Sequence, residues 1–405
     1  MSGEGKPLHS VEVGVRRVSE LDPAAPLPRG DPRLVARIAD EIRRDGPLSF
    51  ARFMDIALYD PEAGYYTAAD GADEATTGPG RAGDFLTAPE GHPIFGWAMA
   101  RHLDSVWVAL DRPARFVVRE HGAGTGALAA GILDGLRRSG SPLLEAIRYQ
   151  PVDAAPARLA ALERRLDGLG LADRLEPADE GPETGAILAN ELLDALPVHR
   201  VEGGPGGLLL ERFVALGPDG AFTTTLGEPS TPALAARLEA EGVRLAPGQP
   251  AEICLAIDAW IARSAAALKR GELLLIDYGY AAAELYRPER GSTLRAYHRH
   301  RVHADPLVAI GRQDLTAHID LTAVERAALA ARLTPIGQTR QARFLAALEA
   351  GALLADLQSD PEMDLGRYLE ARAALVRMVD PRVTGAFTVL AFGRGLDTSA
   401  IRGFR

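Results

Sequence analysis

Cysteine and lysine are almost missing from this 405-residue sequence, which contains one cysteine, Cys254, and two lysines, Lys6 and Lys269. A single cysteine excludes an internal disulfide and fits a reducing compartment, so we expect a cytoplasmic protein in which Cys254 is a buried, inert thiol. Arginine supplies nearly all of the positive charge, which we read as a bias of composition without functional meaning.

Long apolar runs are missing as well. No stretch approaches the length that spans a membrane, and residues 1–30 lack the apolar core of a signal peptide, so we expect this segment to be a flexible tail. The formal net charge is −10. This balance argues against a general nucleic-acid binder, because phosphate contacts need clustered cations, but it permits a basic partner.

The most informative stretch runs from Arg115 to Leu128. A β-branched and aromatic run meets a glycine-rich turn, Glu120-His-Gly122-Ala-Gly124-Thr-Gly126, and a segment rich in Ala and Leu follows. Strand, glycine turn and helix N-terminus form the arrangement with which an α/β sheet cradles a nucleotide. The glycines alone do not identify the ligand, since Gly122-x-Gly124-x-x-Ala127 also satisfies the relaxed dinucleotide pattern.

Two acidic residues narrow the choice of ligand. Glu120 stands two residues before the first glycine, where a carboxylate would repel a pyrophosphate but suit a cationic ligand such as S-adenosylmethionine. Asp153 ends the next expected strand and can accept hydrogen bonds from ribose hydroxyls. Its distance from the glycines exceeds the roughly 20 residues that are typical of dinucleotide folds.

Strand and helix patterns alternate after residue 113, which predicts an α/β, doubly wound parallel sheet. The strands are expected at 116–119, 148–152, near 174–176, 185–189 and 272–277, and helices at 127–140 and 156–166. The first and fourth of these strands should flank the topological switch point, where open α/β sheets bind ligands. Helical segments are expected at 253–270 and 344–379, and a last strand at the sheet edge within 382–392.

Residues 31–112 read as a helical cap or lid, with helices at 31–44, from Ser49 to the Asp-Pro turn, and at 93–110. The aromatic cluster Tyr59, Tyr65 and Tyr66 is more typical of a packed corner than of a ligand site. The motif from Gly83 to Glu90 precedes the glycine turn and fits either a lid or a turn in which Thr87 caps a helix.

Two insertions are expected in the domain that spans residues 113–405. Within 198–250, an antiparallel meander is predicted at 198–226 because strand patterns are separated by Gly-Pro turns. The connection at 281–313 is dense in arginine and histidine, which favours a substrate-facing or anion-binding loop. We expect no metal there, because no cysteine or carboxylate completes a site with His298, His300 and His303.

Taken in order, six blocks resemble the MidA type of class I S-adenosylmethionine-dependent methyltransferases, a family that includes the mitochondrial complex I assembly arginine methyltransferase. The blocks lie between about residues 30 and 395, and the set is more specific than its glycine motif alone. They are Phe53-Met54-Asp-Ile-Ala-Leu58-Tyr59-Asp60-Pro61-Glu-Ala-Gly64-Tyr65-Tyr66, Gly83-Asp84-Phe85-Leu-Thr87-Ala-Pro89-Glu90, Glu120-His-Gly122-Ala-Gly124-Thr-Gly126, Ala189-Asn190-Glu191-Leu-Leu-Asp194-Ala195-Leu196-Pro197, Ile276-Asp277-Tyr278-Gly279-Tyr280 and Gln313-Asp314-Leu-Thr316-Ala-His318-Ile-Asp320.

The resemblance implies a Rossmann-like class I methyltransferase fold and S-adenosyl-L-methionine as cofactor, with S-adenosyl-L-homocysteine as product. The glycines should hold the methionine end of the cofactor, with Glu120 near its ammonium group, Asp153 at the ribose and Asn190 near the methyl group. The expected cofactor-binding residues are Gly83, Thr87, Pro89, Glu120, Gly122, Ala123, Gly124, Gly126, Asp153 and Asn190.

Three residues are candidates for catalysis. Glu191 and Asp194 are three apart, so on a helical turn they would share a face and could grip a guanidinium and accept its proton. Asp194 is about as well explained as a first-turn carboxylate of a helix. His318 could act as a base near neutral pH, although a packed structural histidine fits the sequence equally well.

The resemblance points to a protein arginine nitrogen as the acceptor, on a partner such as a respiratory-complex-type subunit. A small-molecule O- or N-methyltransferase and a non-catalytic, cofactor-binding assembly factor are the alternatives, while a dinucleotide oxidoreductase ranks last because of Glu120 and the spacing of the acids. A homodimer is compatible with the apolar faces.

Overall fold

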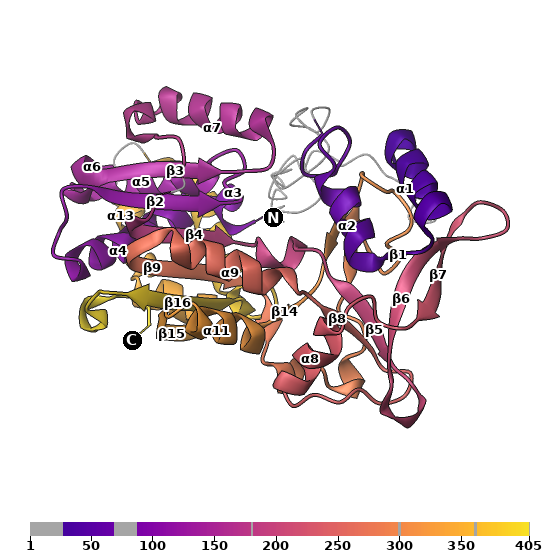
Figure 1. The fold of residues 1–405 in the computed structure, drawn as a ribbon. Coiled ribbons are helices and arrows are strands. Elements are labelled where there is room, and N and C mark those ends of the chain that lie inside the picture. Colours follow the sequence, from indigo (N-terminus) through magenta and orange to yellow (C-terminus); the bar gives the residue numbers. More distant parts are fainter. Residues whose placement is uncertain (1–26, 69–86, 180, 299–300, 360–362, 405) are drawn as a thin grey trace, which may run out of the picture.

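The computed structural model describes residues 27–68, 87–179, 181–298, 301–359 and 363–404 (Figure 1). Its main sheet has six strands, four of them parallel, with the last two strands of the chain antiparallel at one side. In spatial order these are β15 (Thr334–Arg340), β16 (Thr388–Arg394), β9 (Leu268–Asp277), β4 (Glu183–Asn190), β2 (Phe116–His121) and β3 (Ile147–Val152). The predicted doubly wound α/β sheet is confirmed.

Helices cover both faces of this sheet, which is why its strands are apolar at successive positions. Leu188 and Leu274 face one cluster of helices, whereas Ile187 and Leu273 face the other. The first cluster contains α4 (Ile94–Ala109), α5 (Ala127–Ser139), α12 (Gln341–Ala347), α13 (Ala350–Gln358) and α14 (Leu365–Val379), and the second contains α9 (Ala256–Ala266) and α11 (Leu321–Ala330). Three further helices accompany the first strands: α3 (Ala88–Gly91), α6 (Leu143–Ala146) and α7 (Pro156–Gly168).

The strand expected near 174–176 is reduced to one bridge. Residues Ala172–Arg174 form a 3-10 turn, and only Leu175 pairs, with Tyr149 of β3. The N–H of Glu176 still donates to the carbonyl of Tyr149 at 2.9 Å. The next residue is Pro177, which has no N–H and cannot extend the ladder.

Two other predicted boundaries were wrong. β16 is an inner strand, because the polar segment Thr334–Arg340 pairs along its outer side and was not recognised as a strand. The helix expected at 253–270 is shorter, since Ile253 ends the strand β8 (Pro250–Ile253) and β9 begins at Leu268. Exposed Lys269 and Arg270 hide the beginning of β9 from a search for apolar strands.

The predicted meander is antiparallel, as expected, and belongs to a second sheet beside the first (Figure 1). This sheet contains β1 (Leu48–Ser49), β6 (Leu209–Leu216), β5 (His199–Gly203) and β8, with β7 (Phe222–Gly227) paired to β6. Phe50 and Phe53 of α2 (Phe50–Tyr59) belong to the same hydrophobic core as Val198 and Val214. The short helix α8 (Ala233–Ala240) lies farther along the same insertion.

The connection at 281–313 carries elements of its own. It contains α10 (Ala282–Leu285), β11 (Arg295–His298) and β12 (Arg301–His303), and β11 also pairs with β13 (Asp314–Thr316). Just outside it, β10 (Gly279–Tyr280) runs parallel to β14 (Ile319–Asp320). His300, one of the histidines weighed as a metal ligand, lies outside the described residues.

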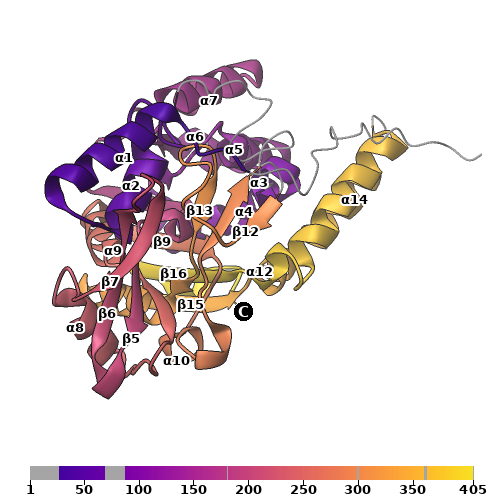
Figure 2. The ribbon, with the colours of Figure 1, turned by 90° about the vertical axis from the view of Figure 1, so that its right-hand side faces the viewer.

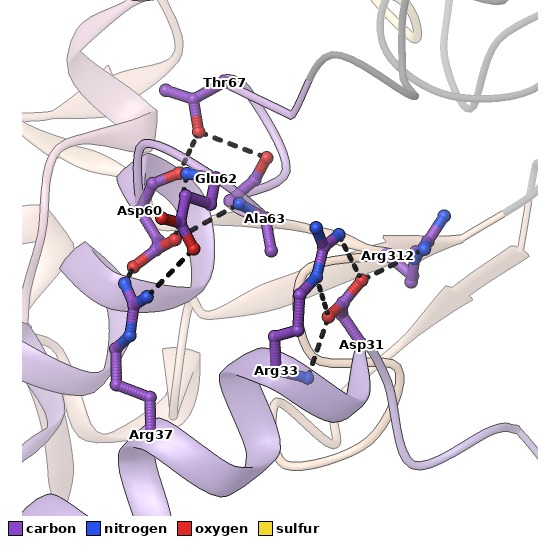
Figure 3. Close-up of polar contacts among 9 residues, drawn as sticks. Asp31, Arg33, Arg37, Asp60, Glu62, Ala63, Thr67 and Arg312 are labelled. Atoms are coloured by element: carbon purple, nitrogen blue, oxygen red, sulfur yellow. Dashed lines mark hydrogen bonds and ion pairs between the residues drawn. The ribbon is translucent and has the colours of Figure 1, made fainter.

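Ion pairs fix the first helix against this late segment (Figure 3). Asp31 caps α1 (Pro32–Asp45), as predicted, and its carboxylate also accepts from Arg312 at 3.1 Å. Hydrogen bonds from Arg33 hold the pKa of Asp31 at about 2, although burial opposes this shift.

The turn after α2 is fixed in the same way (Figure 3). The carboxylate of Asp60 accepts the backbone N–H groups of Glu62 and Ala63 at 3.1 Å and pairs with Arg37 of α1. Tyr66 follows only a few residues later, so these bonds fix the backbone beside the aromatic cluster of Tyr59, Tyr65 and Tyr66.

A buried ion pair anchors the end of the chain. His102 of α4 and Glu272 of β9 are both fully buried, with 2.8 Å between Nε2 and the carboxylate. The other ring nitrogen of His102 lies 2.8 Å from the carbonyl of Arg402. Because both partners are acceptors, both ring nitrogens must donate, which requires the charged imidazolium.

This pair should make stability depend on pH. Burial lowers the pKa of His102, but Glu272 and the carbonyl of Arg402 raise it, and the net result is above 6.5. The contribution is fully present below the unfolded pKa of about 6.5 and is lost as pH rises through the folded value. We expect His102→Gln to lower the free energy of unfolding by about 3–5 kcal/mol near pH 6 and by less near pH 9. Urea unfolding at several pH values checks this, and parallel profiles for both proteins would contradict it.

Candidate functional site

The predicted glycine turn joins β2 to α5 through left-handed backbone. Gly122, Gly124 and Gly126 have φ of 73°, 53° and 81°, a region that L-residues with a Cβ rarely occupy. A Cβ at Gly126 would lie 2.5 Å from Cγ of Leu162, whereas none of the described atoms lies within 4 Å of one at Gly124. Gly126 therefore packs the turn against α7, and Gly124 presents an open face.

Asp153 lies beside this turn at the end of β3. Its carboxylate accepts the N–H of Gly124 at 2.9 Å and the N–H of Ala155 at 2.9 Å. The glycine turn and the acid that the sequence placed on the next strand are thus joined directly.

A cavity of about 340 Å³ opens between this edge of the main sheet and the segment around α2. Eight of the residues predicted to bind cofactor line it: Thr87, Pro89, Glu120, Gly122, Ala123, Gly124, Asp153 and Asn190. Gly126 supports the turn from behind without lining the cavity, and Gly83 lies outside the described residues. Thr87 precedes α3, but its side chain makes no capping bond there.

Glu120 is the buried acid of this cavity. Burial raises its pKa to about 8; a hydrogen bond from Tyr149 at 2.7 Å opposes the shift, and Asp153 and Glu90 add to it. A cation bound beside Glu120 would relieve the cost of ionising it.

Asn190 and Glu191 end β4 at the same cavity. The amide of Asn190 donates to Glu191 at 3.1 Å, and its buried oxygen has no hydrogen-bond partner among the described residues. Glu191 has φ of 52°, a left-handed conformation that costs a non-glycine residue roughly 1–3 kcal/mol. Burial, together with the nearby charge of Asp194, raises the pKa of Glu191 to about 8. A strained backbone thus holds a proton-accepting group in the cavity wall.

Asp194 lies behind this wall. The expected helical turn carrying Glu191 and Asp194 on one face was wrong, because the 3-10 turn starts only at Leu193 and Glu191 is left-handed. Asp194 accepts a short hydrogen bond from Tyr278, and burial raises its pKa to about 6. It does not line the cavity.

Asp277, the last residue of β9, holds this turn in place. Its carboxylate accepts the N–H groups of Leu193 and Asp194 at 2.9 and 3.2 Å. Its pKa is raised well above the usual value by burial and by the neighbouring Asp194.

His318 lies outside the cavity, whereas its predicted role as a base requires it to face that space. It lines a separate cleft with several arginines, and its ring contacts that of Tyr278 at 5.2 Å. Burial, Arg290 and Arg295 lower its pKa to about 4. The structure does not bring His318 to the cavity.

Several aromatic and basic residues of the cavity were missed or given little weight. Tyr59 and Tyr66 line it and stack at 5.6 Å with 25° between their planes, so the cluster read as a packed corner also faces the site. Their clustering was the signal available in the sequence. Trp260 and Arg158 also line the cavity, and nothing in their sequence context marks them.

In residues 27–68, 87–179, 181–298, 301–359 and 363–404, no three His, Cys, Asp or Glu side chains gather closely enough to hold a metal ion. None of the helices in these ranges is long and apolar enough to cross a bilayer.

Comparisons with known proteins agree with this geometry. Residues 98–339 match the family of S-adenosyl-L-methionine-dependent methyltransferases. A Burkholderia thailandensis protein crystallised with S-adenosyl-homocysteine is 34% identical, covering 94% of this chain and 99% of that one with a TM-score of 0.82. The Drosophila melanogaster protein arginine methyltransferase NDUFAF7 homolog, mitochondrial, is 28% identical over 87% of this chain and 84% of its own. The human NDUFAF7 is 27% identical, over 75% and 70%.

A mostly parallel sheet with a glycine turn and buried acids at one edge, covered by helices on both faces, together with the match to the structure crystallised with S-adenosyl-homocysteine, places the protein among the class I methyltransferases. The cofactor of this class is S-adenosyl-L-methionine, and the open face at Gly124 and the buried acid Glu120 fit it. The chain belongs to the MidA-type family of S-adenosyl-L-methionine-dependent methyltransferases.

Cofactor affinity should depend on the ionisation of Glu120. Its pKa of about 8 leaves it mostly protonated at pH 6, and the ammonium group of the ligand favours the carboxylate. Affinity for S-adenosyl-homocysteine should therefore rise between pH of about 6 and about 8, by up to roughly tenfold per unit, and then level off. Calorimetry measures this. Glu120→Gln should bind more weakly with a flat profile, and a flat profile in the wild type would contradict the assignment.

Proposed function

We propose that this protein transfers a methyl group from S-adenosyl-L-methionine to a guanidinium nitrogen of an arginine side chain in an acceptor protein. The observation that carries the proposal is the composition of the cavity: a buried, proton-accepting Glu191 faces the same space as a stacked pair of tyrosines. The names of the curated relatives, protein arginine methyltransferases, support the same acceptor.

The two halves of the cavity suit two different ligands. On the side of the sheet, Asp153 and the glycine turn would hold the nucleoside and methionine parts of the cofactor, which supplies an activated methyl group on a sulfonium. On the other side, the hydroxyl of Tyr59 donates to the carbonyl of Ala195 at 3.0 Å, and that of Tyr66 donates to Asp314 at 2.7 Å. Both rings are thus fixed, so a flat cation that enters the cavity would meet them in a defined orientation.

A guanidinium of the chain itself already uses one of these faces. Arg158 of α7 places its guanidinium carbon 5.4 Å from the centre of the Tyr66 ring. The described part of the chain contains no carboxylate paired with Arg158. This contact is a local precedent for the recognition of an acceptor arginine by Tyr66.

We assign to Glu191 the role of the base that accepts the proton released by the acceptor. A guanidinium nitrogen that gains a methyl group must lose a proton, and Glu191 stands in the wall with a pKa matched to accepting it near neutral pH. We assign to Asp194, held by Tyr278, a second negative charge that favours the cationic acceptor. The role of base considered for His318 passes to Glu191, because His318 lies in another cleft.

Replacing Glu191 tests this assignment. With the cofactor saturating, kcat/KM for an arginine-containing acceptor should rise through pH of about 8 as Glu191 loses its proton, and then level off. Glu191→Gln should lower kcat by roughly 10² or more and abolish the rise, while calorimetry shows unchanged affinity for S-adenosyl-homocysteine. Methyl transfer is followed with labelled cofactor on arginine-containing proteins and peptides.

The outcomes of that screen separate the alternatives. Methylated arginine that disappears in Glu191→Gln supports the proposal. Labelling only of small molecules would replace it with a small-molecule methyltransferase. Cofactor binding without any transfer, and unchanged cellular function of Glu191→Gln, would favour a non-catalytic assembly factor.

The tyrosine pair makes a separate prediction. Tyr66→Leu should raise KM for the acceptor about five- to thirtyfold, because a stacked cation is worth roughly 1–2 kcal/mol. Tyr66→Phe keeps the ring and should raise KM less, although it loses the bond to Asp314. Affinity for S-adenosyl-homocysteine should stay unchanged in both variants. Equal KM values in Tyr66→Leu and the wild type would exclude Tyr66 from acceptor binding.

The cellular location and the oligomeric state of the protein remain predictions. The prediction of a cytoplasmic location rests on the single cysteine. The names of the curated relatives contain the word mitochondrial. Recovery of this protein in an organelle by cell fractionation would contradict the prediction.

A homodimer is supported by α14, which stands away from the body in Figure 2 and exposes Leu365, Leu369 and Val376. Sedimentation at several concentrations would reveal a monomer if this is wrong.

A further inference from the structure

The arginine-rich connection at 281–313, together with His318, forms a separate cleft. Seven residues line this basic cleft: Arg287, Glu289, Arg290, Ser292, Thr293, Arg295 and His318. Three guanidinium groups thus meet one carboxylate, in a chain whose net charge is −10. The cleft shares no lining residue with the cofactor cavity.

Among the described residues, two of the three arginines have no partner of opposite charge. Within that part of the chain, Arg295 donates only to the backbone carbonyls of Ser292 and Leu294, at 3.1 and 2.7 Å. Arg287 is exposed, and across the described ranges of the chain its guanidinium neither pairs with a carboxylate nor donates a hydrogen bond. Both guanidinium groups are therefore available to an anion.

The remaining polar groups are arranged so that they do not neutralise these arginines. Arg290 is held by Glu284 at 3.1 Å and stacks 3.6 Å from the centre of the Tyr280 ring, which fixes its place in the wall. Glu252, the acid beneath the cleft, already accepts from Ser292 Oγ at 2.6 Å and from Thr293 N at 2.8 Å. Among the described residues that line the cleft, exposed Glu289 is the only acid that can compete for the two guanidinium groups.

The ring of His318 lines the cleft. Its Nδ1 is buried and has no hydrogen-bond partner among the described residues, which is costly for a polar group. Burial lowers the pKa of this imidazole to about 4, and the charges of Arg290 and Arg295 add to the shift, so that the ring is neutral near pH 7. An anion in the cleft would neutralise the two arginines while it lies against this ring.

We propose that the basic cleft binds an oxyanion, the phosphate or carboxylate group of a ligand, through the guanidinium groups of Arg287 and Arg295, with the ring of His318 beside it. Guanidinium groups bind both anions through paired, charge-assisted hydrogen bonds. The site is distinct from the cofactor cavity. His318 is nevertheless connected to it, because its ring contacts Tyr278, whose hydroxyl donates to Asp194. The proposal does not rest on the identity of the methyl acceptor.

Titration of the full-length protein with inorganic phosphate and, separately, with acetate tests the site. We expect a Kd of about 1 mM or tighter for at least one of them in low salt. The tighter anion identifies a phosphate or a carboxylate site. Side-chain nitrogen signals of His318 should shift in the same titration, which places the anion at this cleft.

Two double variants provide the comparison. Arg287→Ala with Arg295→Ala should weaken anion binding roughly tenfold or more and leave affinity for S-adenosyl-homocysteine unchanged. Arg367→Ala with Arg372→Ala removes two exposed arginines of α14 and should bind the anion like the wild type. Equal weakening in both double variants, or unshifted His318 signals at about ten times the expected Kd, would overturn the proposal.

Discussion

Burial of carboxyl groups at one edge of a parallel sheet is the constraint on which the site depends. Glu120, Glu191 and Asp277 lie at or directly after the carboxyl ends of β2, β4 and β9, and parallel strands bring these ends to the same edge. Taking acids out of water is costly, and their raised pKa values express that cost. A cationic cofactor and a cationic acceptor are the ligands that relieve it, so the edge is complementary to both reactants of the proposed reaction.

The sheet supplies only one wall of the cavity. The opposite wall comes from α2 and the turn after it, and it is in place because Asp60 binds that turn and Asp31 ties α1 to Arg312. The meander sheet adds the core on which α2 packs. Segments far apart in the chain therefore meet where a methyl group would be transferred, and the helical lead-in is part of the site as well as a cover for it.

The predicted placement of site residues agrees with the structure where neighbouring backbone sets that placement. Gly122, Gly124 and Asp153 are adjacent because a strand, a tight turn and the next parallel strand have nearly fixed geometry. Prediction was poorer where partners are distant. The helical pairing of Glu191 with Asp194 was wrong because Glu191 takes a left-handed conformation, for which its side chain gives no sign.

Distance along the chain also explains the misplaced histidine and the missed strand. His318 precedes Ile319 of β14, and the parallel pairing of that strand with Gly279 and Tyr280 directs the histidine to the basic cleft. β15 was not recognised because a polar edge strand is defined by the strand it pairs with and carries little apolar pattern of its own.

The sequence by itself determined the fold class and the glycine turn with its acids, because periodicity and backbone requirements act over a few neighbouring residues. The resemblance of its six blocks to a known family implied the cofactor. Only the tertiary structure decided that Tyr59 and Tyr66 face the cofactor edge, that Asp194 lies behind the wall, and that the arginine-rich connection forms a separate cleft. Those outcomes depend on contacts between separate elements of the chain, as in the bonds from Tyr66 to Asp314 and from Tyr278 to Asp194. Such contacts are set by the packing of whole elements, which no local pattern specifies.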